Sequence, residues 1–248
     1  MIVLCKGEGP SDIGRSTEPV ADLRDNYGAM GALVLQMVQA CRELDEHEYD
    51  EYKIVSDLCI DVYKDRCPVG LGYLSKSKQV QFKGAKHKEI YFQKEARCFG
   101  FYAKEHEKQG DVVAVLFHDA DSSHANDVSA EKRKAIYLGF ESADFHKGVA
   151  MLPNPTSEAW VLLMLDNVGY RRLVRNTKDR ERLKREVADE LGRRKMDVRD
   201  MYDMIRNGEF SSENLRNDES FADFKQRLCE VLYGLRNHKC FDCDSKRN

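Results

Sequence analysis

Short apolar runs and longer amphipathic stretches alternate along this chain, and together they predict an α/β protein. The run that begins at Val112 is rich in Val and Phe and ends at Asp119 and Asp121, which is typical of a buried strand in a parallel sheet. Residues 1–5 and 149–152 form two further short apolar runs of the same kind. We therefore expect three strands of a mostly parallel sheet.

Apolar residues recur at three- and four-residue steps between and after these runs, and this periodicity predicts helices. The predicted helices lie at residues 20–44, 88–108 and 129–140, and another begins at Thr156 or Ser157, either of which can cap it. From Tyr170 onward every periodic stretch is helical, including one that contains Phe221, Leu228 and Leu235. The expected architecture is a mostly parallel sheet flanked by helices, with an all-helical C-terminal extension.

Acidic residues follow each of the three predicted strands. Glu8 lies between two glycines after the first, Asp119 and Asp121 end the second, and Glu158 follows the third. The carboxyl ends of parallel strands meet at one edge of a sheet, where ligands commonly bind. Clustered carboxylates repel one another unless a cation intervenes, and their hard oxygens suit Mg²⁺ or Mn²⁺.

Each of these acids also has a purely structural interpretation. Asp119 and Asp121 are ordinary residues for a strand-to-loop turn. Asp12, which lies one helical turn beyond Glu8, can cap a helix. Glu158 lies in the first turn of a predicted helix, where a negative charge is favourable.

Basic residues gather in two stretches, although the formal net charge of the chain is -3. Between residues 73 and 108 they outnumber acidic ones and alternate with aromatic side chains, which suits a polyphosphate chain and its bases. A second, arginine-rich stretch begins at residue 170. The candidate nucleic-acid contacts are Lys83, Lys86, Lys88, Arg171 and Arg172, and the alternative is that these are solvated faces.

Composition narrows the choice of protein class. The chain has 248 residues, 42% of them hydrophobic, and no segment approaches the roughly 18 apolar residues of a membrane span.

Eight cysteines are scattered among apolar positions and no signal peptide is expected before the first strand, so we expect a reducing cytoplasm. His238, Cys240 and Cys243 amount to half of a zinc site. No Walker loop or dinucleotide fingerprint occurs.

Three motifs in this order resemble the Toprim domain. They are Gly-Glu-Gly-Pro-Ser-Asp at residues 7–12, the strand running into Asp-x-Asp at 119–121, and Pro-Asn-Pro-Thr-Ser-Glu-Ala-Trp at 153–160. The chain is most similar to compact, stand-alone Toprim-like proteins of bacterial phage-defence loci, related to the overcoming-lysogenization-defect (OLD) nucleases. The resemblance covers about residues 1–168, with an insertion around 45–87, and leaves a C-terminal helical region at 169–248.

This resemblance implies a metal-dependent nuclease that cleaves phosphodiester bonds of DNA or RNA, with tRNA among the candidate substrates. Glu8 would bind metal and serve as general base, and Asp119 and Asp121 would hold Mg²⁺ or Mn²⁺. Asp12 and Glu158 would complete one or two metal sites. The implied partners are nucleic acid and, because the chain has no ATP-binding loop, a separate ATPase subunit; a homo-oligomer is compatible. No lysine matches the one that OLD nucleases place late in the site.

Two other functions fit the same residues. In a haloacid-dehalogenase-like phosphatase an apolar strand runs into Asp-x-Asp, and Asp119 would be the nucleophile. That motif usually opens its domain, whereas here it lies in the middle of the chain. The third hypothesis is a non-catalytic Toprim-like subunit that binds nucleic acid or a partner.

Overall fold

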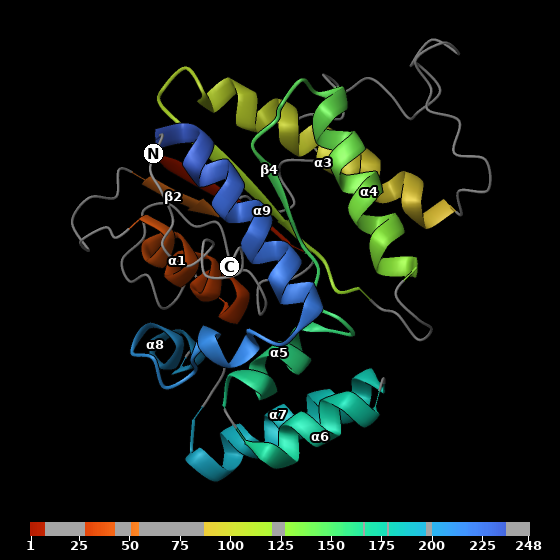
Figure 1. Ribbon diagram of the computed structural model, residues 1–248, viewed down its shortest axis with the longest axis vertical. Helices are drawn as coiled ribbons and strands as arrows, with labels where there is room; N and C mark the ends of the chain where they lie inside the picture. Colours follow the sequence, from red (N-terminus) through yellow and green to blue (C-terminus); the bar gives the residue numbers. More distant parts are fainter. Residues whose placement is uncertain are drawn as a thin grey trace, which may run out of the picture.

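The computed structural model describes residues 1–7, 28–42, 51–54, 87–120, 127–165, 167–177, 179–196 and 200–236. Within this part the centre of the fold is a parallel sheet, which confirms the predicted α/β class (Figure 1). Its strand order is β2-β1-β3-β4. The strands are β1 (Ile2–Lys6), β2 (Glu51–Ile54), β3 (Val112–Phe117) and β4 (Gly148–Met151).

The two inner strands, β1 and β3, end at the same level. Ile2 pairs with Val112 and Lys6 pairs with Leu116, so the chain leaves both strands at one edge of the sheet. Every residue of both strands is buried, which explains why each is a continuous apolar run rather than an alternating one. Of the predicted acidic residues, Asp119 is described by the structure and follows β3 at this shared edge.

Helices cover both faces of the sheet (Figure 1). Val113 and Val115 of β3 belong to the core beneath α1 (Ala29–Arg42) and α9 (Glu219–Arg236). Ala114, on the opposite face, packs beneath α3 (His87–His106) and α4 (Asp127–Ser142). The alternation follows from the two-residue period of a strand. The result is a three-layer α/β/α arrangement.

The remaining helices follow β4, and several lie beyond the carboxyl edge of the sheet (Figure 1). They are α5 (Ser157–Met164), α6 (Val168–Asn176), α7 (Arg180–Arg194), α8 (Asp200–Arg206) and the short 3-10 helix η3 (Ser212–Leu215). Helix α5 packs against α6 and α7, whereas α8 packs against α1. None of the described residues after β4 is in a strand, as the periodicity predicted. No helix of the described part is long and apolar enough to cross a membrane.

Two details at the N-terminal side differ from the sequence-based expectation. Lys6, which lies just beyond the predicted strand at residues 1–5, is the last residue of β1 and is almost completely buried. Strand β2 lies inside the range 45–87 that was predicted as an insertion, and it pairs with β1 at the edge of the sheet. The predicted helix at 20–44 is observed from Ala29, and its earlier residues lie outside the described part.

The crossing of α3 and α4 depends on Gly139. A Cβ at this position would lie 2.4 Å from the Gln93 carbonyl oxygen and 2.6 Å from the Ala96 Cβ. Replacing Gly139 with Ala is therefore expected to lower the free energy of unfolding by about 1–3 kcal/mol. Gly192→Ala in α7 is the control, because nothing lies within 4 Å of its added Cβ and Ala favours a helix. Urea unfolding that finds both variants at wild-type stability or above would contradict this packing.

Candidate functional site

The candidate site begins where the chain leaves β3. His118, Asp119 and Ala120 are all buried, although two of them are polar. The His118 amide donates to the Met151 carbonyl at 3.1 Å, and the Ala120 amide donates to the Pro153 carbonyl at 2.9 Å. The segment after β3 thus runs beside the segment after β4. This pairing brings two of the predicted strand-end motifs together.

Both oxygens of the Asp119 carboxylate have partners. Oδ1 accepts a hydrogen bond from the Ser157 amide at 2.7 Å, at the N-terminus of α5. Thr156 is the N-cap residue of α5 as predicted, but its side chain makes no capping bond, so Asp119 takes this role from across the sheet edge. Oδ2 lies 3.4 Å from Nη2 of Arg180, the first residue of α7. The carboxylate is therefore held by a helix N-terminus and a guanidinium.

Glu158 follows Ser157 directly in the sequence and lies in the first turn of α5. Its Oε2 atom is buried and has no hydrogen-bond partner among the described residues, and the same is true of Thr156 Oγ1. Buried polar atoms normally have partners, so these two unpartnered oxygens at the start of α5 call for an explanation. Hard carboxylate and hydroxyl oxygens are the donors that Mg²⁺ and Mn²⁺ prefer. The side chains of Asp119, Thr156 and Glu158 carry oxygens of this kind.

Most of the other predicted site residues lie outside the part of the chain that the structure describes. Glu8, Asp12, Asp121, Lys83 and Lys86 lie outside the described residues, as does the half zinc site at 238–243. Lys88 is in the first turn of α3, but its side chain is outside the described part, whereas Arg171 and Arg172 are exposed on α6. Among the described residues no three His, Cys, Asp or Glu side chains form a group that could hold a metal.

Two cations at the site were not singled out from the sequence. The Lys132 ammonium of α4 donates to the Asp119 carbonyl at 2.7 Å and lies 4.8 Å from the centre of the Phe92 ring. Arg180 contacts the Asp119 carboxylate from α7. In the sequence each belongs to a run of charged helical residues, and nothing local distinguishes it from its solvated neighbours.

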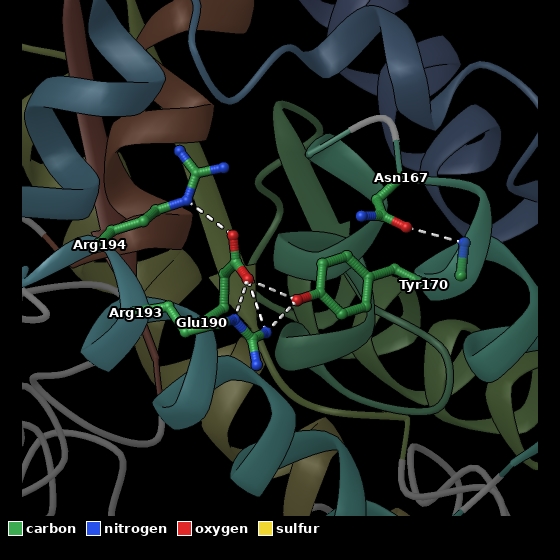
Figure 2. Close-up of polar contacts among 6 residues, drawn as sticks. Asn167, Tyr170, Glu190, Arg193 and Arg194 are labelled. Carbon is green, nitrogen blue, oxygen red and sulfur yellow. Dashed lines mark hydrogen bonds and ion pairs between the residues drawn. The ribbon is translucent and has the colours of Figure 1, made fainter.

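A second polar cluster joins α6 to α7 (Figure 2). The Tyr170 hydroxyl donates to Glu190 Oε2 at 2.6 Å, and Arg193 Nη2 donates to the same oxygen at 2.7 Å. Arg194 Nε donates to Glu190 Oε1 at 2.7 Å. These bonds, the one from Tyr170 foremost, lower the pKa of Glu190 to about 2. Asn167 caps the start of α6 by accepting from the Gly169 amide at 2.8 Å. This cluster fixes one helix on the other.

The cluster predicts a pH-dependent contribution to stability. Because the pKa of Glu190 is lowered from 4.5 to about 2 in the folded protein, its stabilising effect is complete above pH 4.5 and is lost as pH falls toward 2. Glu190→Gln should lower the unfolding free energy by about 1 kcal/mol at pH 7, since water screens the exposed arginines. Urea unfolding should show a clearly larger difference at pH 7 than at pH 2.5, where most of the effect is lost.

Glu181→Gln is the matched control for this measurement. Glu181 lies on the same helix, is 77% exposed and is 3.9 Å from Lys184. Its replacement should change stability by less than about 0.5 kcal/mol at either pH. A Glu190→Gln effect that is equal at both pH values would contradict the ionised cluster.

The chain matches no protein-family model, no curated protein and no solved structure. Any functional conclusion therefore depends on the chemistry of the site and on the motif resemblance.

Proposed function

We propose that the protein is a metal-dependent nuclease that cleaves phosphodiester bonds of DNA or RNA. The supporting observation is the buried Asp119 carboxylate at the end of β3, beside the first turn of α5, where Glu158 has a buried carboxylate oxygen without a partner. The order of the three motifs, which resembles Toprim-like OLD-type nucleases, supports the same activity. By that resemblance the sheet is Toprim-like, residues 1–168 form the catalytic region, and the protein acts in defence against phage.

In this proposal Asp119 and Glu158 hold Mg²⁺ or Mn²⁺, and Glu8, Asp12 and Asp121 complete the ligand set. When bound, the metal lowers the pKa of a water molecule and neutralises charge on the phosphate. The Ser157 amide keeps one Asp119 oxygen in place, so the carboxylate is oriented before a ligand arrives. Glu8 would accept the proton of the attacking water as general base.

The cations around Asp119 would serve the substrate. Arg180 lies at the same carboxylate that would hold the metal, so its guanidinium would contact a phosphate oxygen there. Arg171 and Arg172 on the exposed side of α6, together with Lys83, Lys86 and Lys88, would contact the nucleic-acid backbone. Binding should then weaken steeply as salt rises. An ATPase partner subunit would supply any ATP dependence.

Cleavage assays on plasmid DNA and tRNA test this proposal. We expect the purified protein to cut at least one substrate with Mg²⁺ or Mn²⁺ and neither with EDTA. Glu8→Gln and Asp121→Asn should lose this activity, whereas Asp223→Asn should keep it, because Asp223 pairs with Arg133 between α9 and α4. Unchanged cleavage in both site variants would contradict the assignment.

The same preparation separates the proposal from its alternatives. Rapid hydrolysis of an aryl phosphate without nucleic-acid cleavage would indicate a phosphatase with Asp119 as nucleophile. Binding of nucleic acid without either reaction, and without Mn²⁺ binding in calorimetry, would indicate a non-catalytic subunit.

A further inference from the structure

Three ionisable side chains form a buried contact at the carboxyl edge of the sheet. Glu95 of α3 places Oε1 3.4 Å from the Lys6 ammonium and Oε2 2.5 Å from His118 Nε2. Lys6 is 1% exposed, His118 2% and Glu95 4%. The Glu95 carboxylate thus joins the end of β1 to the first residue after β3.

Phe92 and Lys132 pack next to the buried contact of Glu95 with His118. The Phe92 ring meets the His118 ring edge to face at 4.8 Å, and Lys132 lies 4.8 Å from the centre of the Phe92 ring. Lys132 also donates to the carbonyl of Asp119. Helices α3 and α4 therefore both reach the short segment that carries Asp119.

Stability alone is a poor explanation for these buried charges. Removing charges from water costs several kcal/mol, and well-packed apolar residues often stabilise a fold as much as a buried ion pair does. β1 is already paired with β3 along its whole length, and apolar contacts fill the rest of this core. The contacts of Glu95 with Lys6 and His118 add a defined position for the two chain segments that leave the sheet here.

Those two segments carry proposed metal ligands. Lys6 precedes Glu8 by two residues, and His118 directly precedes Asp119. Glu95 belongs to neither segment and is not among the proposed ligands. We propose that Glu95 is a positioning residue for the metal site, because it fixes the end of β1 relative to the segment after β3. This inference depends on the proposed function, since it requires that Glu8 and Asp119 hold a metal.

Metal affinity separates positioning from a contribution to stability. Glu95→Gln keeps the size of the side chain and a hydrogen-bonding partner for His118, but removes the charge that faces Lys6. Outer groups that orient metal ligands typically change metal affinity or activity 10- to 100-fold when replaced. We expect Mn²⁺ affinity, measured by calorimetry at a temperature where the protein is folded, to fall at least about tenfold. Cleavage at saturating substrate should fall with it.

Phe99→Leu provides a matched control on the same helix. Phe99 is fully buried in the α3–α4 core, so this variant should lower the unfolding temperature but leave Mn²⁺ affinity within about twofold of wild type. If Glu95→Gln does not fold, the double variant Lys6→Met, Glu95→Leu replaces the pair with apolar groups and should retain the fold. It should show the same loss of Mn²⁺ affinity.

The outcomes distinguish this inference from the proposed function. If wild-type protein binds Mn²⁺ and cleaves nucleic acid, and the Glu95 variants bind Mn²⁺ within twofold of it, Glu95 is not a positioning residue although the nuclease assignment stands. If wild-type protein neither binds Mn²⁺ nor cleaves, both are wrong. A loss of affinity equal to that of Phe99→Leu would also overturn the positioning role.

Discussion

Replacing Asp119 with Asn is expected to reduce metal-dependent cleavage by roughly three orders of magnitude. An amide has no negative charge with which to hold a divalent cation, and losing several kcal/mol of transition-state stabilisation has an effect of this size. The amide oxygen can still accept from the Ser157 amide, so α5 should keep its place beside the end of β3. Initial rates of nucleic-acid cleavage at saturating Mn²⁺ measure the effect.

Asp144→Asn is the control for this variant. Asp144 is 77% exposed, lies just after α4 and pairs with Lys104. Asn also tolerates the positive φ of 54° at this position, so the backbone should not change. We expect wild-type cleavage from this control. An Asp119→Asn variant that folds and cleaves within tenfold of wild type would show that Asp119 does not hold the metal.

Replacing Trp160 with Ala is expected to lower the free energy of unfolding by about 3–5 kcal/mol. Trp160, on α5, is fully buried and lies 5.3 Å from the ring of Phe221 and 6.0 Å from that of Phe224, both on α9. Its indole N–H also faces Asp218 at 3.2 Å and Ser220 at 3.1 Å. The variant would lose the aromatic packing between α5 and α9 and this polar contact together.

Trp160→Phe separates the two contributions. It keeps most of the aromatic packing but leaves the Asp218 and Ser220 groups without the indole donor, so a smaller loss of about 1–3 kcal/mol is expected. Urea unfolding at pH 7 measures both variants. If Trp160→Ala stays within 1 kcal/mol of wild type, α5 does not depend on this anchor.

The two inner strands could be predicted from the sequence because a strand that is buried on both faces is a continuous apolar run. β1 and β3 are apolar at nearly every position, since helices cover both faces. β2 gave no such signal: it has only four residues, Glu51 and Lys53 among them, and it lies at the edge of the sheet. Short, polar edge strands depend on pairing with a neighbour, which local pattern does not reveal.

At the candidate site, too, some residues could be predicted from the local sequence, whereas others depend on contacts between distant parts of the chain. The rule that ligands gather beyond the carboxyl ends of strands selected Asp119 and Glu158 as candidates, and the structure brings their segments together. Arg180 and Glu95 depend instead on how distant helices pack. Arg180 is 61 positions from Asp119, and Glu95 is 23 from His118, so no local spacing could predict either contact.

The nuclease assignment depends on a divalent cation at Asp119 and Glu158, and a crystal structure of protein soaked in Mn²⁺ would test this most directly. Anomalous scattering locates Mn²⁺ without reference to any assumed ligand. The proposal predicts an anomalous peak at the carboxyl edge of the sheet, with oxygens of Asp119 and Glu158 about 2.1 Å from the metal, as in Mg²⁺ sites. Crystals that bind Mn²⁺ only elsewhere, with Asp119 still paired to Arg180, would contradict it.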